Sequence, residues 1–307
     1  EFKNQKLKIY VNPAFKFSQL LSKNWKIIRV RNNFFARLKT NIDTTYDYSQ
    51  VKLYFGNMPP LLKTKNSYLF IQNILLLKLK NIKYIRGLMP KTKFFLNFVL
   101  LRLFGNNCEK IVLQNNESVY QAQMIWGNDK IFQFPFMPYI KNYPKKHIKY
   151  DFLFVGGFDP HKNLINVLRS WEKNKKLGMP GSLAITVTKK EFKRNFISKN
   201  DLDLNIIFLG NMPHSKCVLA ISESRCLIFS SSLESLALPL IEAKICGTEI
   251  IASEQDFVYE VCKPYATFVE TNINSISRAL FKFIKMKNSF KKLKLKTVRD
   301  FKNFILN

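Results

Sequence analysis

The sequence of 307 residues is long enough for two domains, and its hydrophobic fraction of 47% excludes an intrinsically disordered protein. Three scattered histidines, and an odd number of cysteines without a CxxC pair, predict no metal site and no disulfide framework, which suits reduced thiols in the cytoplasm. The formal net charge of +29 leaves nucleic acid, an anionic membrane surface and a simple compositional bias as explanations of the basic character.

The first half of the chain predicts an α/β domain built from short strands. Strand-like runs lie at residues 6–12, 25–31, 51–57, 67–73, 109–115 and 130–136, and helical runs lie at 93–104 and 117–126. We assign residues 1–143 to an N-terminal Rossmann-like domain. Since the chain opens on Glu1, without a methionine and without a signal or transit peptide, we expect this domain to be truncated at its start.

Basic residues are concentrated in this first half. Residues 1–150 hold 26 Lys or Arg against 6 Asp or Glu, and no acid lies between Asp47 and Glu109. In residues 74–105, Lys and Arg alternate with Leu, Ile and Phe, and no apolar run reaches the roughly 18–20 residues that a bilayer span requires. The pattern predicts either a segment that lies on an anionic membrane surface or an ordinary pair of solvated helices. No RNA- or DNA-binding signature is present, so we expect no nucleic-acid partner.

The second half predicts a parallel sheet with helices on both faces. Prolines and lysines in residues 137–150 predict the interdomain linker. Strand-like runs follow at 151–157, 182–188, 205–210, 226–232, 248–253 and 266–270, and helical runs at 214–224, 239–246, 256–263 and 273–287. A further helix is expected to begin at Asp159-Pro160, with Asp159 as its cap. We assign residues 144–290 to a C-terminal Rossmann-like domain and residues 291–307 to a basic C-terminal helix.

Two glutamates frame the start of a predicted helix in this second half. Glu234 follows the strand at 226–232, and Glu242 lies in the helix that Pro239 opens. Residues 235–239 would therefore present free backbone amides and the positive end of a helix dipole to the cleft between the domains, which suits a diphosphate. Glu242 could accept hydrogen bonds from a ribose diol, and Glu234 from the hydroxyls of a sugar beyond the diphosphate. Two acceptors that flank an anion site predict a nucleotide-sugar ligand.

The stretch ESLALPLIEAKICG resembles the E-x-F-G-L-P-x-x-E-A-x-x-x-G signature of the retaining GT-B glycosyltransferases of family 4, with Leu236 and Ala237 in place of the usual Phe and Gly. A second stretch, FVGGFDPHKN, is similar to the VGR-x-x-x-x-KN of that family. Lys162 is retained there, but Gly157 stands in place of the arginine. A third stretch, YFGNMPPLLKTKNSYLFIQN, is similar to the FGN-x-PP…QN of members that build bacterial surface polysaccharides such as O-antigen, lipopolysaccharide and capsule.

The resemblance implies a GT-B fold, in which two Rossmann-like domains enclose a cleft, and a metal-independent, retaining transfer of a sugar from a nucleotide-diphosphate donor. It implies catalytic roles for Glu234 and Lys162, donor-binding roles for Glu242, Gly157, Ala237, Leu238, Gly210, Asn211 and Met212, and acceptor-binding roles for Gly56, Asn57, Gln72 and Asn73. The acceptor would be a hydroxyl of a lipid-linked saccharide. We therefore expect a cytoplasmic protein that is peripheral on the inner face of the cytoplasmic membrane and that needs no cofactor.

Three other functions remain open from the sequence, one of them a nucleic-acid-binding module, which a steep salt dependence of binding to arbitrary DNA would identify. A non-transferase enzyme on the same fold, such as a nucleotide-sugar epimerase, would show the same motifs, and so would a degenerate relative without catalysis. Loss of an arginine at Gly157 would forfeit a contact worth roughly 1.5–3 kcal/mol. Each site residue also has an ordinary explanation: Glu242 as a solvated helix residue, Lys162 as a surface lysine, and Gln72 and Asn73 as local caps.

Overall fold

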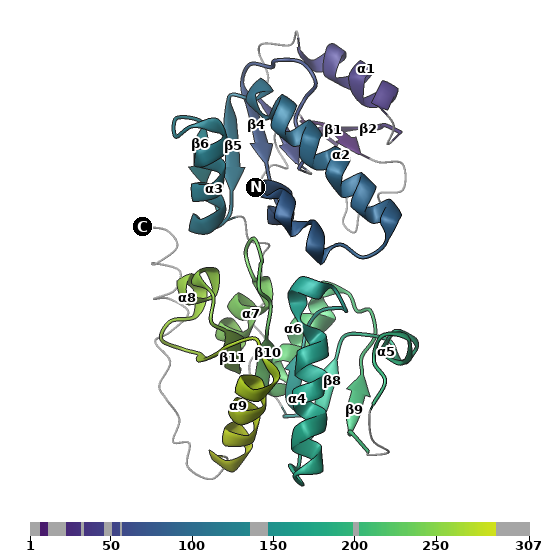
Figure 1. The fold of residues 1–307 in the computed structure, drawn as a ribbon. Coiled ribbons are helices and arrows are strands. Elements are labelled where there is room, and N and C mark those ends of the chain that lie inside the picture. The colour runs from purple at the N-terminus through teal and green to yellow at the C-terminus, as the bar shows by residue number, and fades with distance from the viewer. Residues whose placement is uncertain are drawn as a thin grey trace.

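The computed structural model describes residues 7–11, 23–31, 34–45, 51–55, 57–135, 147–198 and 203–286. Figure 1 shows them as two α/β domains, one above the other, with each half of the chain forming one domain. The predicted α/β class with two domains of parallel sheet is confirmed. Within the ranges just given, no helix combines the length and apolar character needed to cross a bilayer. The predicted C-terminal helix at 291–307 and most of the predicted linker lie outside the described residues.

The C-terminal domain is built around a six-stranded sheet in the order β12-β11-β10-β7-β8-β9, in which every neighbouring pair is parallel. The strands are β7 (Tyr150–Phe154), β8 (Leu183–Ile185), β9 (Ile206–Phe208), β10 (Ser224–Phe229), β11 (Glu249–Ser253) and β12 (Thr267–Val269). Because helices cover both faces, the central strands contain continuous apolar runs, FLF in β7 and CLIF in β10, rather than alternating patterns. Strands β10 and β7 lie side by side at the centre, with Leu227 opposite Leu153.

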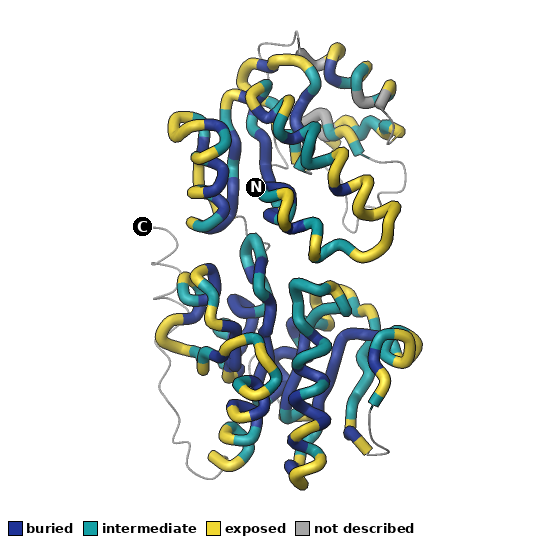
Figure 2. Tube along the Cα trace, in the orientation of Figure 1, coloured by how far each residue is buried: buried dark blue, intermediate teal, exposed yellow. Residues whose placement is uncertain are grey.

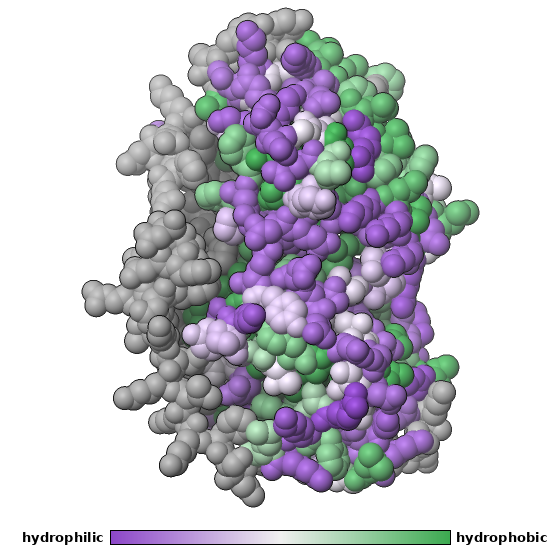
Figure 3. Space-filling model, turned by 60° about the vertical axis from the view of Figure 1, so that its left-hand side comes forward, coloured by the Kyte–Doolittle hydropathy of each residue, from purple (hydrophilic) through white to green (hydrophobic). Residues whose placement is uncertain are grey.

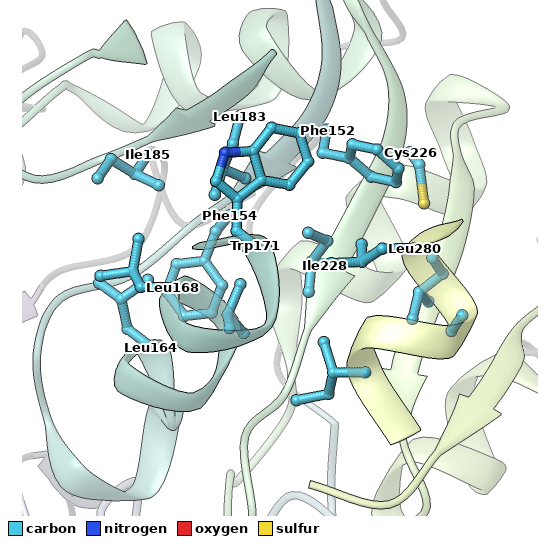
Figure 4. Close-up of a cluster of buried hydrophobic side chains, with 14 of the residues drawn as sticks. Phe152, Phe154, Leu164, Leu168, Trp171, Leu183, Ile185, Cys226, Ile228 and Leu280 are labelled. Atoms are coloured by element: carbon cyan, nitrogen blue, oxygen red, sulfur yellow. The ribbon is translucent and has the colours of Figure 1, made fainter. Parts of the chain in front are cut away.

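Helices pack on both faces of this sheet, as the sequence predicts. On one face lie α4 (Leu164–Lys176) and α9 (Ile273–Lys285), and on the other lie α6 (His214–Ser222), α7 (Leu238–Cys246) and α8 (Asp256–Cys262). Trp171 of α4 is fully buried edge-on to Phe152, and its indole N–H donates to the Leu204 carbonyl at 2.6 Å. Figure 4 shows this tryptophan among the apolar side chains of the sheet and of α4. The apolar stripe that predicts α4 is therefore the side that packs on the sheet.

The N-terminal domain holds a four-stranded parallel sheet in the order β3-β4-β5-β6, and β1 and β2 form a separate parallel pair. The strands are β1 (Leu7–Val11), β2 (Trp25–Arg29), β3 (Lys52–Phe55), β4 (Ser67–Phe70), β5 (Lys110–Leu113) and β6 (Ile131–Gln133). The helices are α1 (Phe34–Thr45), α2 (Leu88–Phe104) and α3 (Asn116–Trp126), with 3₁₀ turns η1 (Ile74–Leu77), η2 (Leu79–Tyr84) and η3 (Gly105–Asn107). Figure 2 shows the buried residues along β4, β5 and α3.

One predicted helix start is wrong. The sequence predicts a helix that begins at Asp159-Pro160 with Asp159 as its cap. The structure instead has a 3₁₀ turn, η4 (Pro160–Lys162), without a side-chain cap, and α4 begins at Leu164. The cause is Asn163, which takes a left-handed conformation with a φ of 59° and donates its side-chain amide to the Thr271 carbonyl at 2.7 Å. Asparagine tolerates this backbone region better than most residues.

Two helices are absent from the sequence-based expectations. The first is α1, and the second is α5 (Lys189–Asn195), which follows β8. A capping box between Thr188 and Glu191 opens α5, with the Thr188 hydroxyl accepting from the Glu191 amide and the Glu191 carboxylate accepting from the Thr188 amide. The Thr-x-x-Glu spacing is a sequence signal for the start of a helix, so α5 can be predicted from the sequence.

Candidate active site

The loops that follow the two central strands meet at the carboxyl edge of the C-terminal sheet. Because β7 and β10 are parallel neighbours, the chain leaves both strands at the same edge. The two loops are held together by backbone groups: the Ser232 amide donates to the His161 carbonyl at 2.8 Å, and the Ser230 hydroxyl donates to the Lys162 carbonyl at 2.8 Å. This frame brings the two predicted catalytic residues together, and Lys162 Nζ lies 2.8 Å from Glu234 Oε1.

The two glycines after β7 have different physical roles. Gly156 has a φ of 149°, and a Cβ there would lie 2.7 Å from Lys162 Cδ. The lysine stem can therefore cross the strand end only because residue 156 is glycine. Gly157 is not in that backbone region, and a Cβ there would meet only Asp159 Oδ2 at 3.6 Å, which is an ordinary contact. The position that usually carries arginine in the resembling family thus has room for a side chain.

Glu234 is held from several sides. The Ser231 hydroxyl donates to Glu234 Oε1 at 3.1 Å, and His161 Nε2 lies 4.0 Å from the same oxygen. Burial lowers the pKa of His161, and the neighbouring charge of Lys162 lowers it further, while Glu234 raises it. The imidazole is therefore neutral at pH 7, and Lys162 is the cation that balances Glu234.

The start of α7 supplies backbone donors beside this pair. Ala237, which stands at the usual glycine of the signature, is the cap of α7 in a left-handed conformation with φ 53° and ψ 48°. Pro239 lies in the first turn, and the cap makes no side-chain hydrogen bond. Within the described part of the chain, the amides of Leu236, Ala237 and Leu238 have no protein acceptor. Free amides at a helix N-terminus favour an anion, as the sequence predicts.

Glu242 is buried and bound to a residue that the sequence analysis did not select. Its side chain is 2% exposed, and Oε1 lies 2.5 Å from Nε2 of His214, the first residue of α6. A buried carboxylate requires such a partner. The loop of Gly210, Asn211 and Met212, which is predicted to bind the donor, is separated from this histidine by one residue, so it adjoins the predicted ribose acceptor Glu242. No motif marks His214 in the sequence, because its partner is 28 residues away.

The N-terminal domain reaches the same loop. Asn115 Nδ2 donates to the Glu234 carbonyl at 2.9 Å, and the Ser232 hydroxyl lies 3.4 Å from the Tyr84 hydroxyl. Leu233, between these two anchors, packs into the hydrophobic core of the N-terminal domain. The segment that carries Glu234 is therefore a joint between the two domains. Asn115 and Tyr84 were not among the predicted site residues, since only the docking of the domains brings them close.

The described acceptor-binding candidates lie together, and the side chains of Asn57 and Asn73 form local hydrogen bonds. Asn57 Oδ1 accepts from the backbone amides of Gln72 and Asn73, both at 2.6 Å, and Asn73 Oδ1 accepts from the Leu75 amide and caps η1. Gly56 lies outside the described residues. These contacts place Asn57, Gln72 and Asn73 at the carboxyl ends of β3 and β4, and their acceptor role stays a prediction.

Metal independence also stays a prediction. Across the residues that the structure describes, no three His, Cys, Asp or Glu side chains gather as a metal site would require. The groups that the structure does bring together, Lys162, Glu234 and the α7 amides, suit a diphosphate and the hydroxyls next to it.

A sequence profile for the family described as "Glycosyl transferases group 1" matches residues 138–298, slightly more than half of the chain. That range holds the C-terminal sheet and both motifs of the candidate site. A comparison with curated protein sequences gave no match.

Solved structures with the same fold have low sequence identity to this chain. Sucrose-phosphate synthase from Thermosynechococcus elongatus has a TM-score of 0.66 and 13% identity, over 91% of this chain and 79% of that one. WaaG, a glycosyltransferase involved in lipopolysaccharide biosynthesis, has a TM-score of 0.66 and 11% identity, over 92% of this chain and 83% of that one. TarM from S. aureus, in complex with fondaparinux, alpha-GlcNAc-glycerol and UDP, has a TM-score of 0.52 and 15% identity over 72% of this chain, which spans 44% of TarM. The fold of the chain is therefore GT-B.

Proposed function

The chain belongs to the group 1 glycosyl transferases, and we propose that it moves a sugar from a nucleoside-diphosphate sugar to a hydroxyl of a lipid-linked saccharide. We propose further that the transfer retains the anomeric configuration, needs no metal, and serves surface polysaccharide biosynthesis. The setting would be cytoplasmic, at the inner face of the cytoplasmic membrane. The single observation that carries the proposal is the Lys162–Glu234 pair beside the free amides of α7.

In the proposed reaction, the bond from the anomeric carbon of the sugar to the diphosphate oxygen breaks. A bond forms from that carbon to the acceptor oxygen, and the proton of the acceptor hydroxyl passes to an oxygen of the departing diphosphate. Negative charge develops on the departing diphosphate. Lys162 and the amides of Ala237 and Leu238 would stabilise this charge, because donors aimed at developing charge act most strongly in a site shielded from water.

The ion pair explains how the site keeps two charges partly buried. Lys162 and Glu234 are 24% and 20% exposed, and each neutralises the other at 2.8 Å. A diphosphate would take over the lysine, and Glu234 would then be free to accept from sugar hydroxyls. The exchange replaces one charge-assisted contact with another, so neither group is left buried and unpaired.

The donor and acceptor classes are supported by two kinds of observation. TarM, which shares the fold, is solved with UDP, and this supports a nucleotide-linked donor. The basic and apolar character of residues 74–105 supports a lipid-linked acceptor at a membrane.

The test is a panel of nucleoside-diphosphate sugars, screened by thermal stabilisation of the purified protein with the Glu242→Ala variant alongside. A ligand at about 100 times its dissociation constant adds roughly 2.7 kcal/mol. The donor that binds is then incubated with polyprenyl-diphosphate-linked saccharides, and NMR of the anomeric proton gives the configuration of the product. An inverted product contradicts retention. Isomerisation of the donor without an acceptor identifies an epimerase, and no binding of any donor identifies a non-catalytic relative.

A further inference from the structure

Helix α2 of the N-terminal domain is apolar on two opposite sides. Phe94 and Leu101, seven residues apart, are buried in the core of the domain. On the other side, Leu88, Leu96 and Leu103 recur at spacings of eight and seven residues, and they are 80%, 57% and 66% exposed. A helix that is apolar all round is normally buried on all sides. The outer side of α2 therefore has the composition of a contact surface.

Two further residues widen this surface. Met89 and Phe95 are exposed next to Leu88 and Leu96. We define the α2 face by these five residues: Leu88, Met89, Phe95, Leu96 and Leu103. Figure 3 shows hydrophobic residues along the right-hand edge of the upper domain, the side to which α2 turns in that view, and Figure 2 colours the start of α2 as exposed. Contiguous apolar surface of this kind marks an interaction site more often than scattered single residues do.

The charges beside the α2 face are all basic. Lys91 and Lys93 are exposed in the first turns of α2, and the helix holds no acidic residue. The neighbouring turn η2, which packs against α2, adds exposed Lys80 and Lys83. Cations near the N-terminus of a helix are disfavoured by its dipole, so the stability of α2 does not explain Lys91 and Lys93. An anionic partner does.

We propose that the α2 face docks on an anionic lipid bilayer, with its apolar side chains at the level of the head groups and the lysines on lipid phosphates. A second copy of this chain fits the same face poorly. A twofold contact through α2 would bring Lys91 and Lys93 of both copies together, and α2 offers no carboxylate to pair them. The proposal names the docking element for the membrane location in the proposed function, and it does not depend on sugar transfer.

The test is co-sedimentation of the full chain with vesicles of phosphatidylcholine and phosphatidylglycerol, and with vesicles of phosphatidylcholine alone. The wild type is expected to bind the anionic vesicles, and less so at high salt. The variant Leu96→Ser/Leu103→Ser should lower the vesicle affinity by a factor of about 100, because it removes the free energy gained by burying two leucine side chains in the bilayer. The variant Lys91→Gln/Lys93→Gln removes two positive charges, and each removed charge should lower the vesicle affinity about fivefold at low salt.

A matched control comes from the same domain. Tyr120 and Met124 of α3 are 64% and 74% exposed, and the Tyr120→Ser/Met124→Ser variant removes as much exposed apolar surface from a different helix. This control should bind as the wild type does, and thermal unfolding should be similar for all variants. If the leucine variant unfolds, the lysine variant and the salt series decide the question.

Three outcomes would overturn the proposal. The wild type does not bind anionic vesicles, or the leucine or lysine variants bind them as the wild type does, or the α3 control loses as much vesicle binding as the leucine variant. Light scattering could instead show a wild-type dimer that becomes monomeric only in the leucine variant. That result would assign the α2 face to a second copy. Vesicle binding without any nucleotide-sugar binding would leave this proposal standing and remove the proposed function.

Discussion

Replacement of Gly157 by arginine should strengthen donor binding. The site holds Lys162 but lacks the arginine that the resembling family carries beside it, and residue 157 has the space for one. A Cβ at this position meets only Asp159 Oδ2, at 3.6 Å, and the backbone is outside the region that requires glycine. Arginine can hold a phosphate through two parallel hydrogen bonds.

The magnitude follows from three contributions. A hydrogen bond to a charged group is worth about 1.5–3 kcal/mol, which corresponds to roughly 10- to 150-fold in the dissociation constant. Pairing of the new guanidinium with exposed Asp159 costs at most about 1 kcal/mol of this gain, because surface ion pairs are weak. Replacement of a glycine at an ordinary backbone position also raises the free energy of unfolding by about 0.4–1 kcal/mol.

Titration calorimetry with a nucleoside diphosphate measures the effect, with two alanine variants as controls. Gly157→Ala should gain the stability increment but no affinity, so its difference from Gly157→Arg isolates the guanidinium. Gly156→Ala should weaken binding, since its Cβ would lie 2.7 Å from Lys162 Cδ. If Gly157→Arg binds no more tightly than Gly157→Ala, the diphosphate does not lie beside residue 157 and the reasoning fails.

Three further predictions concern the neighbours of this pair. Asn115→Asp keeps the cap of α3 but removes the donor to the Glu234 carbonyl, so it should lower the free energy of unfolding by about 1–3 kcal/mol. Amide hydrogen exchange in the Glu234 loop should become faster, and unchanged exchange would contradict the interdomain joint. His214→Ala should lower the free energy of unfolding, measured with denaturant, by about 1–3 kcal/mol. The double variant His214→Ala/Glu242→Gln should recover most of this loss. No recovery would mean that the carboxylate does not need its partner. Ala237→Val should destabilise the protein by more than about 1 kcal/mol, because β-branched residues fit a positive φ poorly. Ala237→Gly should stay within about 1 kcal/mol of the wild type. Equal melting temperatures for the two variants would refute the left-handed cap.

The strands and helices of the C-terminal domain, and the assignment of Lys162 and Glu234 to one ligand site, could be predicted from the sequence. Both follow from local signals: apolar runs that end in glycine or serine, a proline that opens α7, and the rule that parallel strands end at one edge of a sheet. The motif resemblance added the roles of the two residues. The contact between them depends on the order of the sheet, in which β7 and β10 are neighbours although β8 and β9 lie between them in the chain.

The features that escaped prediction depend on contacts between distant residues. Asn163 ends the η4 turn because its side chain reaches the Thr271 carbonyl, 108 residues away. His214 matters only because α6 packs beside α7, and Asn115 only because the two domains dock. Helix α5 is a different case, since its Thr188–Glu191 capping box is a local signal that the sequence itself contains.

The most direct test of the central claim is the affinity of the protein for a nucleoside diphosphate and for the corresponding monophosphate, measured for the wild type and for Lys162→Gln. A matched control is Lys173→Gln, since Lys173 lies on α4 and bonds to Asn274, outside the candidate site. If Lys162 binds the phosphate that the monophosphate lacks, Lys162→Gln should lose roughly 10- to 150-fold in diphosphate affinity, the value of one charge-assisted contact, and little in monophosphate affinity. Equal affinities for the wild type and Lys162→Gln, or the same loss for both nucleotides, would contradict the assignment of this site to a sugar donor.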